Sequence, residues 1–499
     1  MPSSHTPEVI VARFLQSNHY NETLDAFLTE AGLAPDAGQT AAGDWTIEKI
    51  LEEKRQYDAS IVYEKTTSGE QADGGWTLPA PSQPDTITSL GSPSNILAVH
   101  VTPTKTSWAT GEDGRKPLQL LVSSADRKIS VLSTRIGYEL EKTVDLSLTH
   151  NSPVLCLTPI HHDAWMTSSM SGHVDLYAAG HRCLDSVRHH VKYSVQVIVT
   201  QSCRDGQPER PFCVAATAGW DQKICLYLFE PPSDASIPHG EEQDGSPVIG
   251  SPLATFPVAT NPESILFVRH PDTNELYLIV GRRDSTYLYY YKITEHSPQS
   301  TITVHEAGKQ NLAPHANAWI SFSPSSIAAC PKDPTLIAVA TSHLPHMKLI
   351  LVRLLFPGTR EHETGAAGFV RGDTQTSQAR AELAIQDGED AAIRLHVSTM
   401  APQTPYSTPQ VVWRPDGSGM WVNGDDGVIR GLETRTGKVV ALLRGHEVGS
   451  KVRSLWAGMV RVQGTDDGNG SEKEEEWLVS GGFDKRVIVW KPGNGDSAV

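Results

Sequence analysis

The sequence lacks the features that mark secreted and membrane-bound proteins. No apolar run approaches the roughly 18 residues that a membrane span needs, and residues 1–10 lack the basic and then apolar pattern of a signal peptide. The six cysteines form no C-x-x-C pair, so we expect reduced thiols. We therefore predict an intracellular protein, in the cytoplasm or the nucleus, without membrane contact.

Positive charge is also scarce. The 499 residues include 42 Lys and Arg against 58 Asp and Glu, a formal net charge of −16. Direct binding of nucleic acid is not expected, because phosphate contacts need clustered Lys and Arg. With 38% hydrophobic residues, 40 Gly and 33 Pro, the composition indicates a globular, turn-rich chain.

Motifs for catalysis and metal binding are missing. The nucleotide-binding patterns G-x-x-x-x-G-K-[ST] and G-x-G-x-x-G do not occur, nor do G-x-S-x-G and H-E-x-x-H. The adjacent pairs at 161–162 and 189–190 are histidines, but neighbours on a strand point to opposite faces and do not suit one ion. We predict no enzyme activity, no catalytic residue, no cofactor and no metal.

Residues 6–65 show helical spacing. Thr6, Pro7 and Glu8 form a helix start: a capping hydroxyl, a proline at the first helical position and an acid that the helix dipole favours. Two apolar faces follow, one on each side of a turn near Tyr20, and their main residues are Ile10, Phe14, Leu15, Leu24, Phe27 and Leu28. Two such short helices cannot bury these faces alone, and a second copy could cover them.

A third amphipathic helix is predicted to start at Thr46. It either packs on the body of the protein or extends the contact between two copies.

The stretch from Val11 to Leu33 resembles the LisH motif, with its paired hydrophobics, an aromatic at the turn and F-x-x-E at Phe27–Glu30. The resemblance implies a homodimer with four antiparallel helices. Its interface would contain Ile10, Phe14, Leu15, Tyr20, Leu24, Phe27 and Leu28.

Residues 66–84 are rich in Gly, Pro, Ser and acids, and we predict a flexible linker there. From residue 85 to residue 491 the chain alternates short apolar strands with turn signals, as all-β proteins do.

This long region repeats one unit. The clearest copy runs from Trp477 to Trp490 as strand, tight turn and strand, with Asp484 in the turn. The same frame places Asp126, Asp221, Asp284 and Asp426 in equivalent turns, and weaker copies carry Ser171 and His346 there. These seven copies predict seven blades of a β-propeller.

An innermost strand can be assigned ahead of each turn. The seven segments are Ile96–Val101, Val154–Thr158, Val195–Thr200, Ile265–Val268, Ile327–Ala329, Val411–Trp413 and Val452–Trp456. None of them contains Asp or Glu, which argues against a pair of catalytic acids on the channel.

The repeat resembles the WD40 family. The last copy carries the fullest signature, in which the resemblance implies a hydrogen-bonded relay of His446, Ser480, Asp484 and Trp490. Other copies depart from it: Val122 and Val280 stand at the hydroxyl position, and Tyr177, Tyr227 and Tyr290 stand at the tryptophan position. The predicted fold is therefore mainly β, a seven-bladed WD40 propeller with a small α-helical LisH module.

The residue before each turn aspartate should project onto one rim of the ring. Trp220, Arg283 and Phe483 occupy such positions, and Trp319 and Tyr406 lie in long loops. Aromatic residues and arginine often anchor protein interfaces. These five residues are the candidate partner-binding set, unless the aromatics pack against neighbouring loops instead.

Taken together, these patterns predict a non-enzymatic scaffold or adaptor that dimerises and binds protein partners in a multiprotein complex. Transcriptional corepressor subunits and ubiquitin-ligase subunits share this order of modules. Three alternatives remain: a catalytic propeller (hydrolase or isomerase) with a channel site, a dynein or microtubule regulator of the lissencephaly type, and a purely structural dimer with no regulated partner. The second usually has a coiled coil between the modules, whereas residues 66–90 contain no heptads.

Overall fold

The computed structural model describes most of the chain: residues 6–41, 44–51, 75–90, 93–102, 118–135, 137–161, 164–178, 181–204, 207–229, 248–296, 301–314, 322–357, 375–463 and 472–493. The chain divides into two compact units, Met1–Glu64 and Lys65–Val499.

The first unit is helical. It contains α1 (Pro7–Ser17) and α2 (Asn21–Glu30), and residues 47–51 are also helical. Ala12 of α1 packs against Leu24 and Leu28 of α2 in a small core. Thr6 is the N-cap of α1, as expected, but its side chain makes no capping hydrogen bond. The continuation of the third helix beyond residue 51 lies outside the described residues.

Arg13 ties the segment after α2 back to α1. Its side chain is buried, forms an ion pair of 2.8 Å with Asp44, and donates to the carbonyl oxygens of Trp45 at 3.1 Å and Gln39 at 3.4 Å. A buried guanidinium needs such acceptors. This unit therefore extends past the two helices, at least to Trp45.

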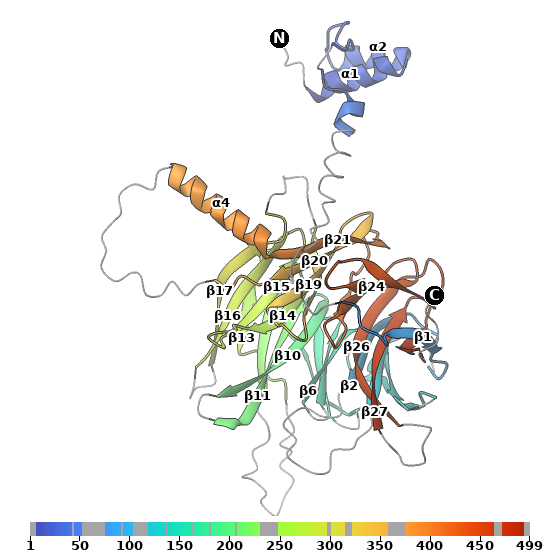
Figure 1. Ribbon diagram of the computed structural model, residues 1–499, viewed down its shortest axis with the longest axis vertical. Coiled ribbons are helices and arrows are strands. Elements are labelled where there is room, and N and C mark those ends of the chain that lie inside the picture. The colour runs from blue at the N-terminus through green and yellow to red at the C-terminus, as the bar shows by residue number, and fades with distance from the viewer. Residues whose placement is uncertain are drawn as a thin grey trace, which may run out of the picture. The chain divides into compact units, whose positions relative to one another are not determined.

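The second unit consists of seven four-stranded sheets, which confirms the predicted propeller (Figure 1). Blade 1 comprises β2 (Ile96–Thr102), β3 (Gln119–Ser124), β4 (Lys128–Ser133) and β5 (Leu140–Asp145), followed by the short 3-10 helix η1 (Leu146–Leu148). Blade 2 comprises β6 (Val154–His161), β7 (Ala164–Ser169), β8 (His173–Tyr177) and β9 (Cys183–Arg188). Blade 3 comprises β10 (Ser194–Arg204), β11 (Gln207–Gly219), β12 (Lys223–Phe229) and β13 (Ala254–Pro257).

The remaining blades follow the same order. Blade 4 comprises β14 (Pro262–Arg269), β15 (Leu276–Arg282), β16 (Tyr287–His296) and β17 (Thr301–Asn311). Blade 5 comprises β18 (Pro324–Ala329), β19 (Leu336–Thr341), β20 (His346–Arg353) and β21 (Ile393–Pro402). Blade 6 comprises β22 (Val411–Trp413), β23 (Gly419–Val422), β24 (Val428–Glu433) and β25 (Val439–Arg444). Blade 7 comprises β26 (Val452–Gln463), β27 (Glu472–Gly482), β28 (Val487–Pro492) and β1 (Pro81–Thr86).

The first strands of neighbouring sheets contact one another around a closed ring, from β2 through β6, β10, β14, β18 and β22 to β26, which contacts β2 again. These strands contain the seven segments predicted as innermost. One correction concerns their chemistry: β14 begins at Pro262 and so includes Glu263. The inference that no acid lies on an innermost strand is therefore wrong, because the predicted segment started at Ile265.

Blade 7 joins the two ends of the propeller. Strand β1 pairs antiparallel with β28, with Pro84 opposite Trp490 and Asp85 opposite Val489. Pairing begins at Pro81, so the ordered region starts before residue 85, and the predicted linker 66–84 is too long at its end. The pairing covers an edge of blade 7 that would otherwise be open.

Residues ahead of β1 fasten blade 6 as well. The Trp76 ring packs edge-on against Trp421, with 5.1 Å between ring centroids, and lies 4.5 Å from the Arg414 guanidinium. Gly419 and Gly431 leave room for it, since a Cβ at either position would overlap the Trp76 ring. The chain before β1 thus contacts one blade and β1 completes the next.

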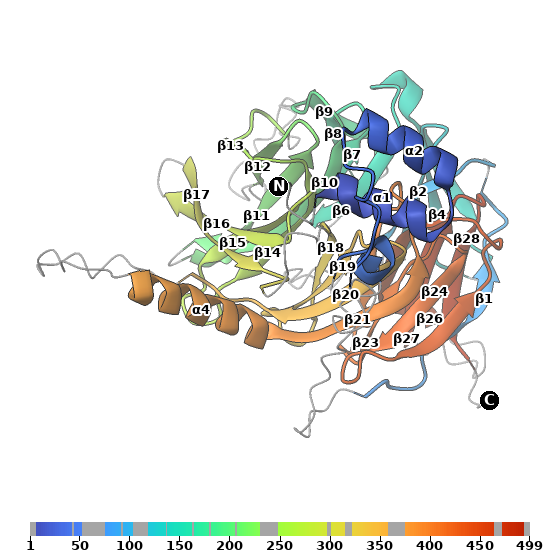
Figure 2. The ribbon, with the colours of Figure 1, turned by 90° about the horizontal axis from the view of Figure 1, so that it is seen from above.

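Helix α4 (Gln375–Ala392) is inserted between β20 and β21 and extends outward from the propeller (Figures 1 and 2). Its last turn is anchored where Glu389 accepts a hydrogen bond of 2.7 Å from the backbone N–H of Asn311. Among the described residues, no helix combines the length and apolar character needed to cross a bilayer.

Candidate functional site: the rim and axis of the propeller

The structure brings together the four residues of the expected relay in blade 7. His446 Nδ1 donates to Asp484, with both carboxylate oxygens at 3.0 Å, and its Nε2 lies 2.8 Å from Ser480 Oγ. Trp490 Nε1 donates to the same Oγ at 2.9 Å. Burial disfavours the Asp484 carboxylate, but hydrogen bonds from His446 and from backbone N–H groups outweigh it and hold the pKa of Asp484 below its usual value.

Blade 3 contains a second relay of the same kind around His190. Its Nδ1 lies 2.9 Å from the Asp221 carboxylate and its Nε2 lies 2.8 Å from Thr217 Oγ1. The side chain is fully buried, and the sequence reading gave it no partner. The signal was present: Thr217 precedes Asp221 by four residues, as Ser480 precedes Asp484, and each histidine lies in the loop before its innermost strand.

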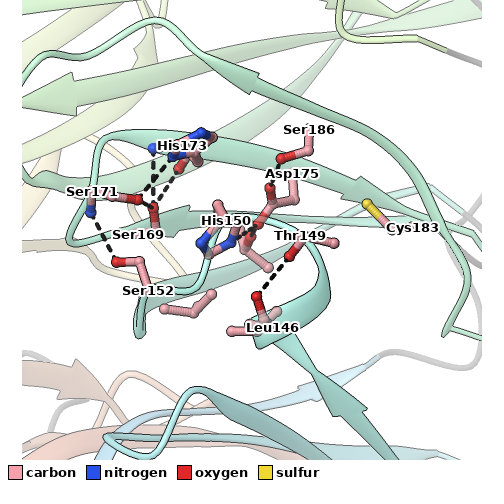
Figure 3. Close-up of polar contacts among 12 residues, drawn as sticks. Leu146, Thr149, His150, Ser152, Ser169, Ser171, His173, Asp175, Cys183 and Ser186 are labelled. Atoms are coloured by element: carbon pink, nitrogen blue, oxygen red, sulfur yellow. Dashed lines mark hydrogen bonds and ion pairs between the residues drawn. The ribbon is translucent and has the colours of Figure 1, made fainter.

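Blade 2 has a rearranged relay (Figure 3). Ser171 stands at the turn, and the acid is Asp175, four residues later on β8. Fully buried Asp175 accepts hydrogen bonds from His150 at 2.8 Å, Thr167 at 2.8 Å and Ser186 at 2.6 Å. The sequence frame missed Asp175 because it was aligned on the turn. An aspartate within the apolar run of β8 was the available signal.

The other turn aspartates make local contacts. Asp126 accepts a hydrogen bond of 2.5 Å from Ser124, and Asp426 forms an ion pair of 2.7 Å with Arg430. The Asp284 backbone N–H donates to Ser323 at 2.9 Å. No relay histidine contacts these three aspartates in the described part of the chain.

Two of the candidate rim residues lie together between blades 3 and 4, in what we call sector A (Tyr193, Trp220, Glu263 and Arg283). The Arg283 guanidinium lies 4.6 Å from the centre of the Trp220 ring, and its Nε forms an ion pair of 2.7 Å with Glu263. The Tyr193 ring lies 5.4 Å from that of Trp220. Burial raises the pKa of Glu263, although Arg283 opposes the shift.

Two others lie in the loops of blades 6 and 7, in sector B (Tyr406, Asp425, Lys451 and Phe483). The Lys451 ammonium contacts Thr404 Oγ1 and Asp425, both at 2.9 Å. The backbone carbonyl of Lys451 accepts a hydrogen bond of 2.8 Å from the Phe483 backbone N–H. The Tyr406 side chain is 88% exposed and that of Phe483 is 37% exposed. Trp319, the fifth candidate, lies outside the described residues.

The sectors differ in how their aromatics are packed. Trp220 is half-buried against its neighbours. This agrees with the alternative that the aromatics pack against neighbouring loops. The Tyr406 side chain, by contrast, is almost fully exposed. The rim therefore holds both packed and exposed aromatic side chains.

The candidate dimerisation residues fall into two groups. Leu24 and Leu28 are buried within the unit, so they form its own core. The others keep part of their surface accessible: Ile10, Phe14, Leu15 and Phe27 are half-buried, and Tyr20 is 54% exposed.

One titratable group on an innermost strand is His100. His100 of β2 packs against Trp456, with 6.3 Å between ring centroids, and burial lowers its pKa to about 4. It is therefore neutral at pH 7. In the described part of the chain, no three or more His, Cys, Asp or Glu residues are grouped so that they could hold a metal ion.

Comparison with protein families agrees with this architecture. A model of the UCP007778 family, described as its β-propeller domain, matches residues 112–491. The chain belongs to the UCP007778 family. The LisH domain of the same family matches residues 6–34, which confirms the LisH prediction, and no curated protein matches the chain. UCP007778 proteins thus combine two kinds of domain that typically mediate protein interactions.

Proposed function

We propose that this protein is a non-enzymatic scaffold that self-associates through its LisH domain and holds protein partners on the propeller rim. The observation that carries the proposal is sector B, where exposed Tyr406 and Phe483 stand on loops joined by the Lys451 contacts. A rigid frame reduces the loss of entropy when a partner binds. Exposed aromatics on such a frame supply anchors.

Self-association is supported by the size of the LisH core. Among its described residues, the central cluster buries Ala12, Leu24 and Leu28, which is little for an independent fold. Half-buried Phe14 and Phe27 would be covered by a second copy. A dimer presents two rims, so a weak contact gains avidity toward a multivalent target. These features suit a subunit of a multiprotein complex of the corepressor or ubiquitin-ligase kind.

The Phe14→Asp variant should convert a dimer into a single 54.3 kDa chain, because a charge would then lie in the apolar contact between copies. Light scattering of the full-length protein measures the mass. Thr23→Asp, an exposed position on α2, is the matched control and should remain dimeric. A dimeric Phe14→Asp protein would contradict the LisH role.

Partner binding is tested with the variant Tyr406→Ala, Phe483→Ala. Affinity purification of the full-length protein with quantitative mass spectrometry should show at least a tenfold loss of specific partners. The control, Val440→Ala with Leu442→Ala, removes exposed apolar side chains from β25 of blade 6. Equal recovery with both variants would exclude sector B as the binding surface.

A further inference from the structure

Six of the seven innermost strands have a register shift of the β-bulge kind at their second residue. The residues at these register shifts are Leu97, Leu155, Val195, Glu263, Ser325 and Arg453. A bulge leaves one residue without a partner across the ladder and redirects its side chain. The six residues therefore occupy equivalent places around the propeller axis, and only two of them are charged.

These bulges lie at the end of the propeller that carries the rim. Each innermost strand starts opposite the end of its second strand, so Val452 pairs with Gly482, next to the turn that holds Phe483. Lys451 of sector B directly precedes this start. In blade 4, Glu263 contacts Arg283 of sector A.

Arg453 is the second residue of β26, one of the seven first strands that contact one another around the ring. It comes from blade 7, yet it interacts electrostatically with Cys156 of blade 2 and Glu263 of blade 4. Those blades are not neighbours of blade 7, so the three side chains can influence one another only across the inside of the ring. Arg453 thus lies between sector A and sector B.

The Arg453 side chain lacks a hydrogen-bonding partner among the described residues. Among the described residues, no hydrogen bond or ion pair involves its guanidinium, although the side chain is half-buried. Glu263 is already paired with Arg283 at 2.7 Å. A partly desolvated guanidinium with its donors unused is unfavourable, and burial indeed lowers the pKa of Arg453. The planar guanidinium group of Arg453 has paired N–H donors that can bind a carboxylate or a phosphate in a bidentate manner.

We propose that Arg453 binds the oxyanion of an acidic or phosphorylated side chain in a partner peptide that lies across the rim from sector B to sector A. This inference rests on the proposed scaffold function and adds the chemistry of the partner. Apolar residues of the same peptide would pack against the flanking aromatic side chains. These are Phe483 and Tyr406 on one side and Trp220 on the other. The site is cationic within a chain of net charge −16, so the attraction is local.

The first test needs no peptide and uses inorganic phosphate as the probe. The Arg453→Gln variant of the full-length protein should melt at a higher temperature than wild type, because it removes a charge without a partner. At constant ionic strength, replacing chloride with 50 mM phosphate should raise the melting temperature of wild type about 2 °C more than that of Arg453→Gln. A lower melting temperature of the variant, or equal phosphate effects, would overturn the proposal.

The second test uses a phage-displayed library of random 12-residue peptides selected on the full-length protein. Selected peptides should share an Asp or Glu between apolar residues, and Arg453→Gln should bind them at least tenfold more weakly. The Arg453→Lys variant keeps the positive charge but lacks the paired N–H donors of the guanidinium. Its affinity for the peptides should lie between those of wild type and Arg453→Gln. Arg461→Gln is the control, an exposed arginine on the same strand. Synthetic peptides with phosphoserine in place of the acid then show whether phosphate or carboxylate binds better.

The outcomes separate the two proposals. If Arg453→Gln keeps peptide and cellular partners while Tyr406→Ala, Phe483→Ala loses them, this inference is wrong and the scaffold function stands. If neither variant loses partners, both are wrong. Selected peptides without a shared acid would also exclude the oxyanion role.

Discussion

Replacing Glu476 with alanine is expected to lower the free energy of unfolding by about 3 kcal/mol. Glu476 of blade 7 accepts two hydrogen bonds from Arg414 of blade 6, at 2.9 and 2.7 Å. The Arg414 side chain is 1% exposed, so the variant leaves a buried charge without its counterion. The contact between blades 6 and 7 should therefore unfold before the rest of the propeller.

The same guanidinium also holds the chain ahead of β1. It donates to the Thr77 carbonyl at 2.8 Å and, at a longer 3.4 Å, to that of Pro79. Loss of Glu476 thus weakens both the blade contact and the closure of the ring. Thermal unfolding, followed by tryptophan fluorescence, measures the change, since Trp76 and Trp421 lie beside Arg414.

Two further variants test whether the cost of Glu476→Ala comes from the buried charge of Arg414. Glu474→Ala removes an acid two residues away on the same strand, from an exposed pair with Arg461 of β26, and should cost less than about 1 kcal/mol. The double variant Arg414→Met, Glu476→Ala should be more stable than Glu476→Ala, because the uncompensated cation is gone. A double variant no better than the single one would show that packing, not charge, dominates.

The second large effect is expected at Asp175. Its alanine variant leaves the buried His150 and Thr167 side chains without their shared acceptor, whereas the exposed Ser186 hydroxyl can bond to water instead. Each unsatisfied buried donor costs about 1–3 kcal/mol, so the free energy of unfolding should fall by about 3–5 kcal/mol. Blade 2 should lose protection against hydrogen exchange before the other blades.

Asp126→Ala is the matched control for this variant. Asp126 stands in the turn of blade 1 that corresponds to the turn of Ser171 in blade 2. Its side chain is 27% exposed, and its loss should cost about 1 kcal/mol. Asp175→Asn should lie between the two, since an amide oxygen can still accept from Thr167 or Ser186. If Asp126→Ala proved as destabilising as Asp175→Ala, turn geometry rather than the buried relay would stabilise the blades.

Much of the architecture follows from local patterns in the sequence. The spacing around Phe14 and Phe27 predicts the two helices, because a helix repeats its face every three to four residues. Strands and turns recur around Asp221 and Asp484 in one frame, which predicts the blades. Even the relay of His446 could be assigned, since its members keep fixed offsets within one repeat.

Departures from the repeat could not be assigned in this way. Because blade 2 was aligned on Ser171, the alignment did not identify Asp175 as the acid of the relay. The acid can stand at a different position of the repeat as long as its carboxylate still reaches the same donors. Similarly, the limit set at Ile265 excluded Glu263, since a bulge breaks the alternation on which strand limits are judged.

The sequence by itself determined that this protein is a helical LisH domain followed by a propeller, because both are built from short-range periodicity. Only the tertiary structure decided which distant residues meet. Trp76 and Arg414 are 338 positions apart, and Arg453 of blade 7 interacts electrostatically with residues of blades 2 and 4. Such contacts depend on how the ring closes, and ring closure is a property of the whole chain that no local pattern contains.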